Sequence, residues 1–245
     1  MRRITISFLL GSLFVFSACD LLEPKNDNHS TFDRVFKEPT FAVGLLIRAY
    51  PYLPTNDYRW DDVATDDAVT NDKFNNFMRM ATGEWSALYN PQNFWDNSNR
   101  AILYANEFLG IVDKIVWKRT NPAVNELYRK RLTGEAYAIR GIHKFFLLRN
   151  HAGIGKNGQL LGIPIYNKFL ENQEDFSTPR ATFEESVSSV YADFTEALKY
   201  LPLDYGNISS LDNLPPGFTD ITDVNHYNAV FGDMSRQRIC GRYVK

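Results

Sequence analysis

The chain has 245 residues, of which 44% are hydrophobic and 23% are charged, and its 27 basic side chains nearly balance 29 acidic ones. This is the composition of an ordinary globular protein, so it argues against disorder, collagen and coiled coils, and a net charge of −2 gives no sign of a nucleic-acid surface. Two cysteines are too few for a disulfide scaffold, whereas 18 Phe, 13 Tyr and 4 Trp must either fill a core or meet a partner.

Residues 1–18 read as a secretory signal peptide that resembles those of bacterial lipoproteins. Arg2 and Arg3 precede an uncharged, mostly apolar run, which is too short to span a bilayer core about 30 Å thick. Small residues then lead to Cys19, which we expect to be lipidated after cleavage. The alternative is a plain secretory signal with a chance cysteine. Cleavage removes two arginines, so 25 basic and 29 acidic residues remain and the net charge becomes −4.

Residues 19–31 are predicted to be the lipidated cysteine and a flexible tether, because the segment is polar and has little to bury. A tether of this length reaches about 20 Å root-mean-square. The remainder, residues 32–245, is predicted to form one helical domain.

Helical spacing first appears in two segments, at about 38–50 and about 91–116. The first carries one apolar stripe that includes Phe41, and Pro51 ends it. The second has small and apolar residues at spacings of three and four from Trp95 onward. This spacing predicts that Trp95 belongs to the core.

Two further helices are predicted, at about 122–150 and from Thr182 to about residue 201. The first of these contains small residues such as Gly141, which allow a neighbouring helix to approach closely, so we expect it to be central. The second opens with Thr182 and Glu185, the spacing of a capping box. The phenylalanines predicted to be core are Phe41, Phe145, Phe146, Phe183 and Phe194.

No cofactor or metal site is evident in the sequence. Residues 153–158 match G-x-G-x-x-G, but they follow a long helix and open none, so we expect a helix C-terminal loop and not a dinucleotide site. The histidines lack the spacing of zinc ligands. Residues 162–166 are predicted to be a short extended segment, and the chain after Pro202 has few apolar residues in register.

The densest acidic cluster lies between the first two helices. Its members are Asp61, Asp62, Asp66, Asp67 and Asp72. Their spacing does not fit a calcium loop. Either the cluster is a solvated loop, or a pair of its carboxylates performs glycoside hydrolysis.

Aromatic and amide side chains alternate between residues 74 and 95. Sugars present an apolar face and a rim of hydroxyls, so they suit aromatic platforms flanked by Asn and Asp. We therefore expect Trp85, Tyr89 and Asn90, with Asp66 and Asp67, to contact a ligand. The alternative is that Trp85 and Tyr89 pack their loop onto the rest of the protein.

The chain resembles the SusD/RagB family in four ordered blocks. The first is the lipobox cysteine with a helix that ends in Arg48-Ala49-Tyr50. The second is Trp95 followed by Ile102, Ala105-Asn106 and Leu109. The third is EAYAIR (135–140) with FFLLR (145–149) and GIP (162–164). The fourth is PRATFEE (179–185) with DFTEAL (193–198) and Leu201-Pro202.

This resemblance implies an all-α fold of tetratricopeptide-like helix pairs with long ligand-binding loops. It also implies a lipoprotein of the Bacteroidetes outer membrane that binds a glycan or another nutrient for a SusC-like TonB-dependent transporter, without catalysis, cofactor or nucleic acid. The matched blocks correspond to the N-terminal part of the family, so we expect residues 32–245 to be a SusD-like helical domain that is incomplete at its C-terminus.

Two other functions remain open from the sequence. The chain is a helical-repeat module that docks to the transporter without a ligand site of its own, or it is a glycosidase that uses carboxylates between Asp61 and Asp72.

Overall fold

A computed structural model describes residues 38–54, 60–86, 88–91, 93–170 and 177–232. Contacts divide the chain into Met1–Arg34 and Val35–Lys245, and all described residues belong to the second unit. The predicted signal peptide, Cys19 and the tether lie outside the described residues.

Helices make up most of the described fold, as predicted. The α-helices are α3 (Pro39–Ile47), α4 (Asn76–Ala81), α5 (Trp95–Ile111), α6 (Pro122–His151), α7 (Phe183–Tyr200) and α8 (Val224–Phe231). Short 3-10 turns are η2 (Tyr50–Tyr52), η3 (Trp60–Ala64), η4 (Val112–Lys114) and η6 (Leu211–Asn213), and the strands are β1 (Gly153–Ile154) and β2 (Leu160–Leu161). None of the described helices combines the length and the apolar character that crossing a membrane requires.

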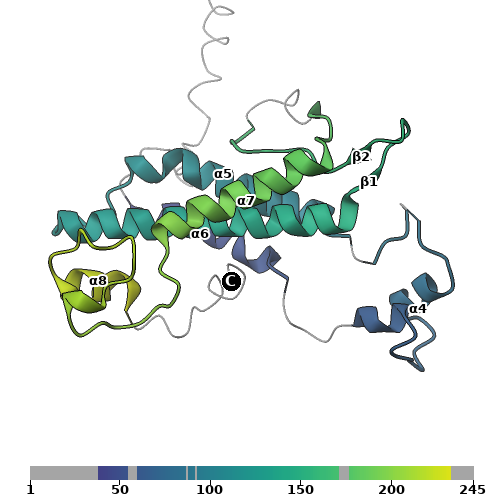
Figure 1. The fold of residues 1–245 in the computed structure, drawn as a ribbon, viewed down its shortest axis with the longest axis horizontal. Helices are drawn as coiled ribbons and strands as arrows, with labels where there is room; N and C mark the ends of the chain where they lie inside the picture. Colours follow the sequence, from purple (N-terminus) through teal and green to yellow (C-terminus); the bar gives the residue numbers. More distant parts are fainter. Residues whose placement is uncertain (1–37, 55–59, 87, 92, 171–176, 233–245) are drawn as a thin grey trace, which may run out of the picture. The chain divides into compact units, whose positions relative to one another are not determined.

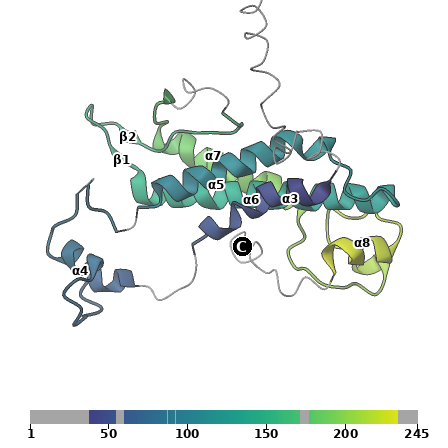
Figure 2. The same cartoon turned by 180° about the vertical axis from the view of Figure 1, so that it is seen from behind.

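The central element is α6, against which α5 and α7 both pack (Figure 1). Ser98 near the start of α5 contacts His143 near the end of α6, whereas Asn106 further along α5 contacts Arg140. Arg140 also pairs with Asp193 in the second half of α7. Neighbouring helices therefore run antiparallel, the arrangement of tetratricopeptide-like pairs, and α3 packs on α5 behind them (Figure 2).

Small residues of α6 allow α7 to approach closely, as the sequence indicated. A methyl group added at Gly134 would lie 2.7 Å from Leu201 Cγ, and one added at Gly141 would lie 3.0 Å from Phe194 Cε1. A contact of 2.7 Å requires Leu201 to shift, and one of 3.0 Å is tighter than nearly all real contacts, so both glycines allow the close approach of the two helices.

The start of α7 confirms the predicted capping box. Glu185 N–H donates to Thr182 Oγ1 at 3.2 Å, and Thr182 N–H donates to Glu185 Oε2 at 2.9 Å. Two backbone N–H groups that the helix leaves without partners are thereby satisfied.

The prediction for the phenylalanine core was only partly right. Phe146 is buried, but Phe41, Phe145 and Phe183 are exposed. A helix buries only the stripe that meets its neighbour, and on α3 that stripe runs through Ala42 and Leu46. Phe41 lies off this stripe and is exposed, whereas Val43 and Leu45 at its edges are half-buried against the core.

The G-x-G-x-x-G segment forms a hairpin loop. It lies at the turn between β1 and β2, which pair antiparallel with Gly153 opposite Leu161. Gly158 has φ +79°, which favours glycine. Strand β2 follows it, so the loop belongs to a hairpin and is not the helix C-terminal loop that was predicted.

The prediction that the chain after Pro202 has few apolar residues in register was wrong. Tyr227, Val230 and Phe231 on α8 pack with Phe218 against the first turns of α6. Asp223 caps the helix by accepting from Asn225 N–H at 2.8 Å. The helix is eight residues long, too short for its periodicity to stand out from the surrounding Gly, Pro and Asn.

Candidate functional site

The predicted sugar-binding loop contains η3 and α4. Asn75 begins α4 by accepting from Phe77 N–H and Met78 N–H. Trp85 is 59% exposed, as expected for a ligand contact. Tyr89, however, already has partners within the loop, because its hydroxyl donates to Asn76 Oδ1 at 2.8 Å and Arg79 lies 3.9 Å from its ring centre. These contacts lie within the loop, whereas the alternative from the sequence had Trp85 and Tyr89 packing the loop onto the rest of the protein.

Four acidic residues of this loop, Asp62, Asp66, Asp67 and Asp72, are solvent-facing. Asp66 and Asp67 are exposed, and the Asp67 N–H donates to Thr65 Oγ1 at 3.1 Å in a local turn. The described residues contain no group of three His, Cys, Asp or Glu side chains that could hold a metal ion. Asn90 is half-buried. None of these residues lines either of the two cavities described next.

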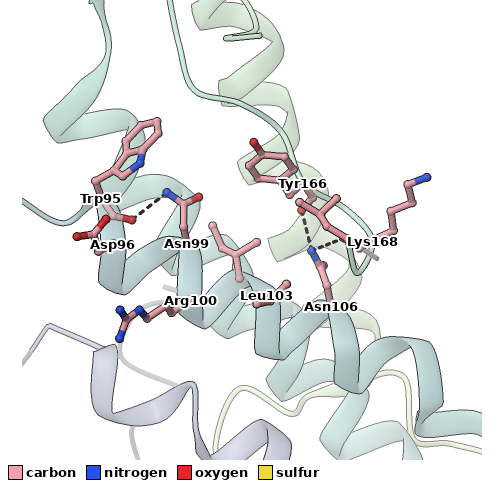
Figure 3. Close-up of a pocket in the computed structure, with 10 residues that line it drawn as sticks. Trp95, Asp96, Asn99, Arg100, Leu103, Asn106, Tyr166 and Lys168 are labelled. Carbon is pink, nitrogen blue, oxygen red and sulfur yellow. Dashed lines mark hydrogen bonds between the residues drawn. The ribbon is translucent and has the colours of Figure 1, made fainter. Parts of the chain in front are cut away.

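The first cavity, of about 430 Å³, lies between the first turns of α5 and the segment that follows β2. Its lining residues are Trp95, Asp96, Asn99, Arg100, Ile102, Leu103, Asn106, Tyr166, Lys168 and Leu170. Figure 3 shows Trp95, Asn99, Leu103 and Tyr166 around one space, whereas the charged end of Lys168 points away. The walls that face each other are thus aromatic, with an amide between them.

Trp95 belongs to this cavity and not to the core, which corrects the prediction. It is 36% exposed, and its ring meets the edge of His151 with centroids 5.3 Å apart. Burial, with Arg180 nearby, lowers the pKa of His151, whose ring lies beside Trp95. Trp95 opens α5, and burial against α6 begins one turn later at Ser98.

Asn99 is fixed in place by the helix itself. Its side-chain nitrogen donates to the Trp95 carbonyl oxygen at 2.8 Å (Figure 3). An amide held next to an aromatic ring can hydrogen-bond a ligand hydroxyl while the ring covers an apolar face.

The opposite wall is the segment 165–170, which we call the strap. Tyr166 and Leu170 line the first cavity, Ile165, Asn167 and Phe169 line a second cavity of about 790 Å³ beside α6 and α7, and Lys168 lines both. The strap therefore lies between the two cavities.

The chain approaches the strap through Gly162, a position that only glycine can occupy. A methyl group added at Gly162 would lie 1.9 Å from Ser186 Oγ. That hydroxyl accepts from Ile163 N–H at 3.0 Å and donates to the Thr182 carbonyl at 2.9 Å. The chain therefore leaves β2 pressed against the first turn of α7.

Behind the strap lies a buried group of charges, which we call the ionic cluster: Arg140, Lys144 and Asp193. Arg140 Nη2 lies 2.5 Å from Asp193 Oδ1, and Lys144 Nζ lies 2.8 Å from Asp193 Oδ2. Lys144 also donates to Asn167 Oδ1 at 2.6 Å. Burial lowers the pKa of Lys144, while Asp193 opposes that shift.

Sequence reasoning missed Asn99 and Tyr166 as site residues. Asn106, Arg140 and Asp193 were recognised only as parts of family motifs, without a role. The single local signal was the extended GIPIY run, whose last residue is Tyr166. Its closeness to Trp95 depends on how α5, α6 and the strap pack, which spacing along the chain does not reveal.

The comparisons with known proteins identify the family. Residues 20–212, well over half of the chain, match the SusD-like family described as "Starch-binding associating with outer membrane". The chain belongs to the SusD/RagB family. No curated protein matches the chain.

Solved SusD-like structures share the fold at low sequence identity. A SusD-like protein from Bacteroides fragilis is 17% identical with a TM-score of 0.58, and the match covers 75% of this chain and 33% of that one. A SusD-like carbohydrate-binding protein from Bacteroides vulgatus is 21% identical with a TM-score of 0.53, covering 85% and 44%. A laminarin-binding SusD-like protein is 18% identical with a TM-score of 0.53, covering 73% and 37%. The SusD-like chain described here thus spans less than half the length of each of these relatives.

Proposed function

We propose that this SusD-like protein is an outer-membrane lipoprotein, anchored through Cys19, that binds a glycan non-covalently for import through a SusC-like TonB-dependent transporter. The family description and the carbohydrate-binding relatives support this role. The role requires binding and release without any bond being made or broken, so it needs no catalytic residue.

The observation that carries the proposal is the cavity between Trp95 and Tyr166. Its volume of about 430 Å³ suits a small ligand. Two aromatic rings with the Asn99 amide between them offer apolar contact and a directional hydrogen bond, which together match the faces and hydroxyls of a sugar. The charged end of Lys168 points away, and Asp96 and Arg100 supply one charge of each sign to the lining, so the cavity favours a neutral saccharide.

The loop residues predicted from sequence enter the proposal in a secondary role. Trp85 is exposed and can stack on a long glycan, and Asp66, Asp67 and Asn90 lie in the same loop. Tyr89 supports the loop instead of the ligand, because its hydroxyl and ring are engaged by Asn76 and Arg79.

Affinity electrophoresis of the full mature chain tests this function. We expect retardation in gels that contain starch or laminarin, and titration with maltohexaose and laminarihexaose to identify the tighter ligand. Trp95→Ala should weaken binding by about 30-fold, the loss of about 2 kcal/mol typical of a central aromatic contact. Trp85→Ala tests the secondary contact and should change binding less than threefold by the same scale.

Two outcomes would count against the proposal. If the folded protein is not retarded by either polymer, the proposal of glycan binding is refuted. Loss of binding in Trp85→Ala but not in Trp95→Ala would move the site to the loop of residues 60–91.

The docking module remains a second candidate, favoured by one observation. Phe74 is 89% exposed and Leu88 is fully exposed in the same loop as Trp85. Exposed apolar side chains of this size gather at protein interfaces. Co-purification with the transporter that is lost in Phe74→Ser, in a protein without glycan affinity, would select this function.

A further inference from the structure

The side chain of Asn106 is buried and has a hydrogen-bond partner for each of its polar atoms. It is 3% exposed. Its Nδ2 donates to the backbone carbonyls of Tyr166 and Lys168, both at 3.1 Å (Figure 3). Its Oδ1 accepts from Arg140 Nη1 at 2.7 Å. An amide has two donor hydrogens and one oxygen, so these contacts use its donors fully.

Arg140 determines which way this amide points. A guanidinium can only donate, so the Asn106 oxygen must face it and the nitrogen must face the strap. The reverse orientation would bring the amide hydrogens against Arg140 and the oxygen against two carbonyl oxygens. Asp193 in turn holds Arg140 through Nε and Nη2. The ionic cluster thereby fixes the amide, and the amide fixes the strap.

The atoms that Asn106 holds belong to the backbone and not to side chains. The carbonyls of Tyr166 and Lys168 point toward α5, and the Tyr166 ring flanks them as a wall of the first cavity. The intervening Asn167 carbonyl accepts at 3.2 Å from Arg140 Nη1, the same nitrogen that donates to Asn106 Oδ1. Three successive carbonyls are thus bound to one connected group of side chains, which leaves the strap a single position across from Trp95.

We propose that Asn106 is a positioning residue of the ligand cavity, which acts by holding the backbone of the strap so that Tyr166 faces Trp95. This inference rests on the proposed function, since it assigns Asn106 a part in binding the same saccharide. Asn106 acts only through Tyr166.

Asn106→Asp tests the proposal with little other change. Aspartate has the shape of asparagine and keeps an acceptor for Arg140, but it has no donors for the two carbonyls. The ionic cluster holds two cations and one carboxylate, so it accommodates a second carboxylate. Ser98→Ala is the matched control, because Ser98 is buried on the same helix and bonds His143 instead of the strap.

The first measurement needs no ligand. Lys168 lies in the strap and Lys156 in the hairpin loop, and trypsin cuts after either when the backbone opens locally. In Asn106→Asp, cleavage after Lys168 should accelerate about tenfold or more, as expected for the loss of two backbone hydrogen bonds. Cleavage after Lys156 should not change, and Ser98→Ala should cleave like the wild type. Unchanged cleavage after Lys168 would overturn the proposal.

The second measurement is a double-mutant cycle with laminarihexaose and maltohexaose as probes. Asn106→Asp should weaken binding about tenfold in the wild-type background, but less than twofold in Tyr166→Ala, because coupled residues are not additive. Equal losses in both backgrounds would show that Asn106 does not act through Tyr166. If the wild type binds neither probe, the proposed function fails while the protease result still decides whether Asn106 holds the strap. Should Asn106→Asp not fold, Asn106→Ala is scored in the same way.

Discussion

Replacing Asp193 with asparagine should destabilise the protein more than any other single change in the ionic cluster. Asp193 is the only carboxylate among the described residues that pairs with Arg140 and Lys144, and all three side chains are buried. Breaking a buried ion pair by removing one partner costs about 3–5 kcal/mol, because the other charge stays buried without compensation. Here two cations would be left, so we expect the upper part of that range.

Removing one of the two cations should be much less harmful. Lys144→Met leaves Arg140 and Asp193 as a matched pair and fills a similar volume with apolar atoms. It gives up hydrogen bonds to Asn167 and Ser189, for which we expect a loss of about 1–2 kcal/mol. The two variants should therefore differ by at least about 2 kcal/mol in the free energy of unfolding.

The dependence on pH provides an internal check. Because the pKa of Lys144 is lowered on folding, the unfolded chain binds the proton more tightly, and stability rises as the pH increases toward the unfolded value of 10.5. Asp193→Asn removes the carboxylate that opposes this shift of the Lys144 pKa. The difference in the free energy of unfolding between the wild type and Asp193→Asn should therefore become smaller between neutral pH and about pH 10.

Urea unfolding followed by circular dichroism measures the free energies of unfolding of the wild type and of both variants at each pH. The cluster argument is refuted if Lys144→Met costs as much as Asp193→Asn. It is also refuted if the deficit of Asp193→Asn stays constant over that pH range.

Two further predictions concern the helix contacts. Burial lowers the pKa of His143 to about 4, so the free energy of unfolding is highest above the unfolded pKa of 6.5 and should fall by about 3 kcal/mol as the pH decreases to 4. Unfolding curves of His143→Gln should lack this dependence on acid, and a variant with the acid dependence of the wild type would contradict the prediction. Gly134→Ala should destabilise by about 1–3 kcal/mol because the new methyl group meets Leu201. Gly44→Ala, where nothing lies within 4 Å of the added methyl group, should stabilise the protein by about 0.5–1 kcal/mol. If the thermal midpoints of Gly134→Ala and Gly44→Ala move in the same direction, the clash with Leu201 is refuted.

Local chemistry made much of the helical fold predictable. The capping box at Thr182 and Glu185 needs only neighbouring residues, so it could be located from spacing. The close approach at Gly141 was likewise visible, because only a small residue permits it. Both signals are complete within a few residues of sequence.

The candidate site was harder because it depends on contacts between distant segments. Trp95 has helical spacing, but its exposure depends on where α6 stops covering α5. Tyr166 lies 71 residues further along the chain and reaches the same cavity only because Asn106 holds its backbone. Trp85 and Tyr89 looked equivalent in sequence, and only the contacts of Arg79 and Asn76 distinguish them.

The strap separates two kinds of evolutionary change. Tyr166 lines the first cavity with a side chain on whose identity the backbone contact to Asn106 does not depend. Under the proposed function, substitution at this position can alter which saccharide is selected while the strap keeps its place. Asn167 instead contacts Lys144 of the ionic cluster, where a new side chain would have to satisfy that cation. A lineage could thus exchange ligands by changing a cavity-lining residue of one short segment, with the helices behind it left untouched.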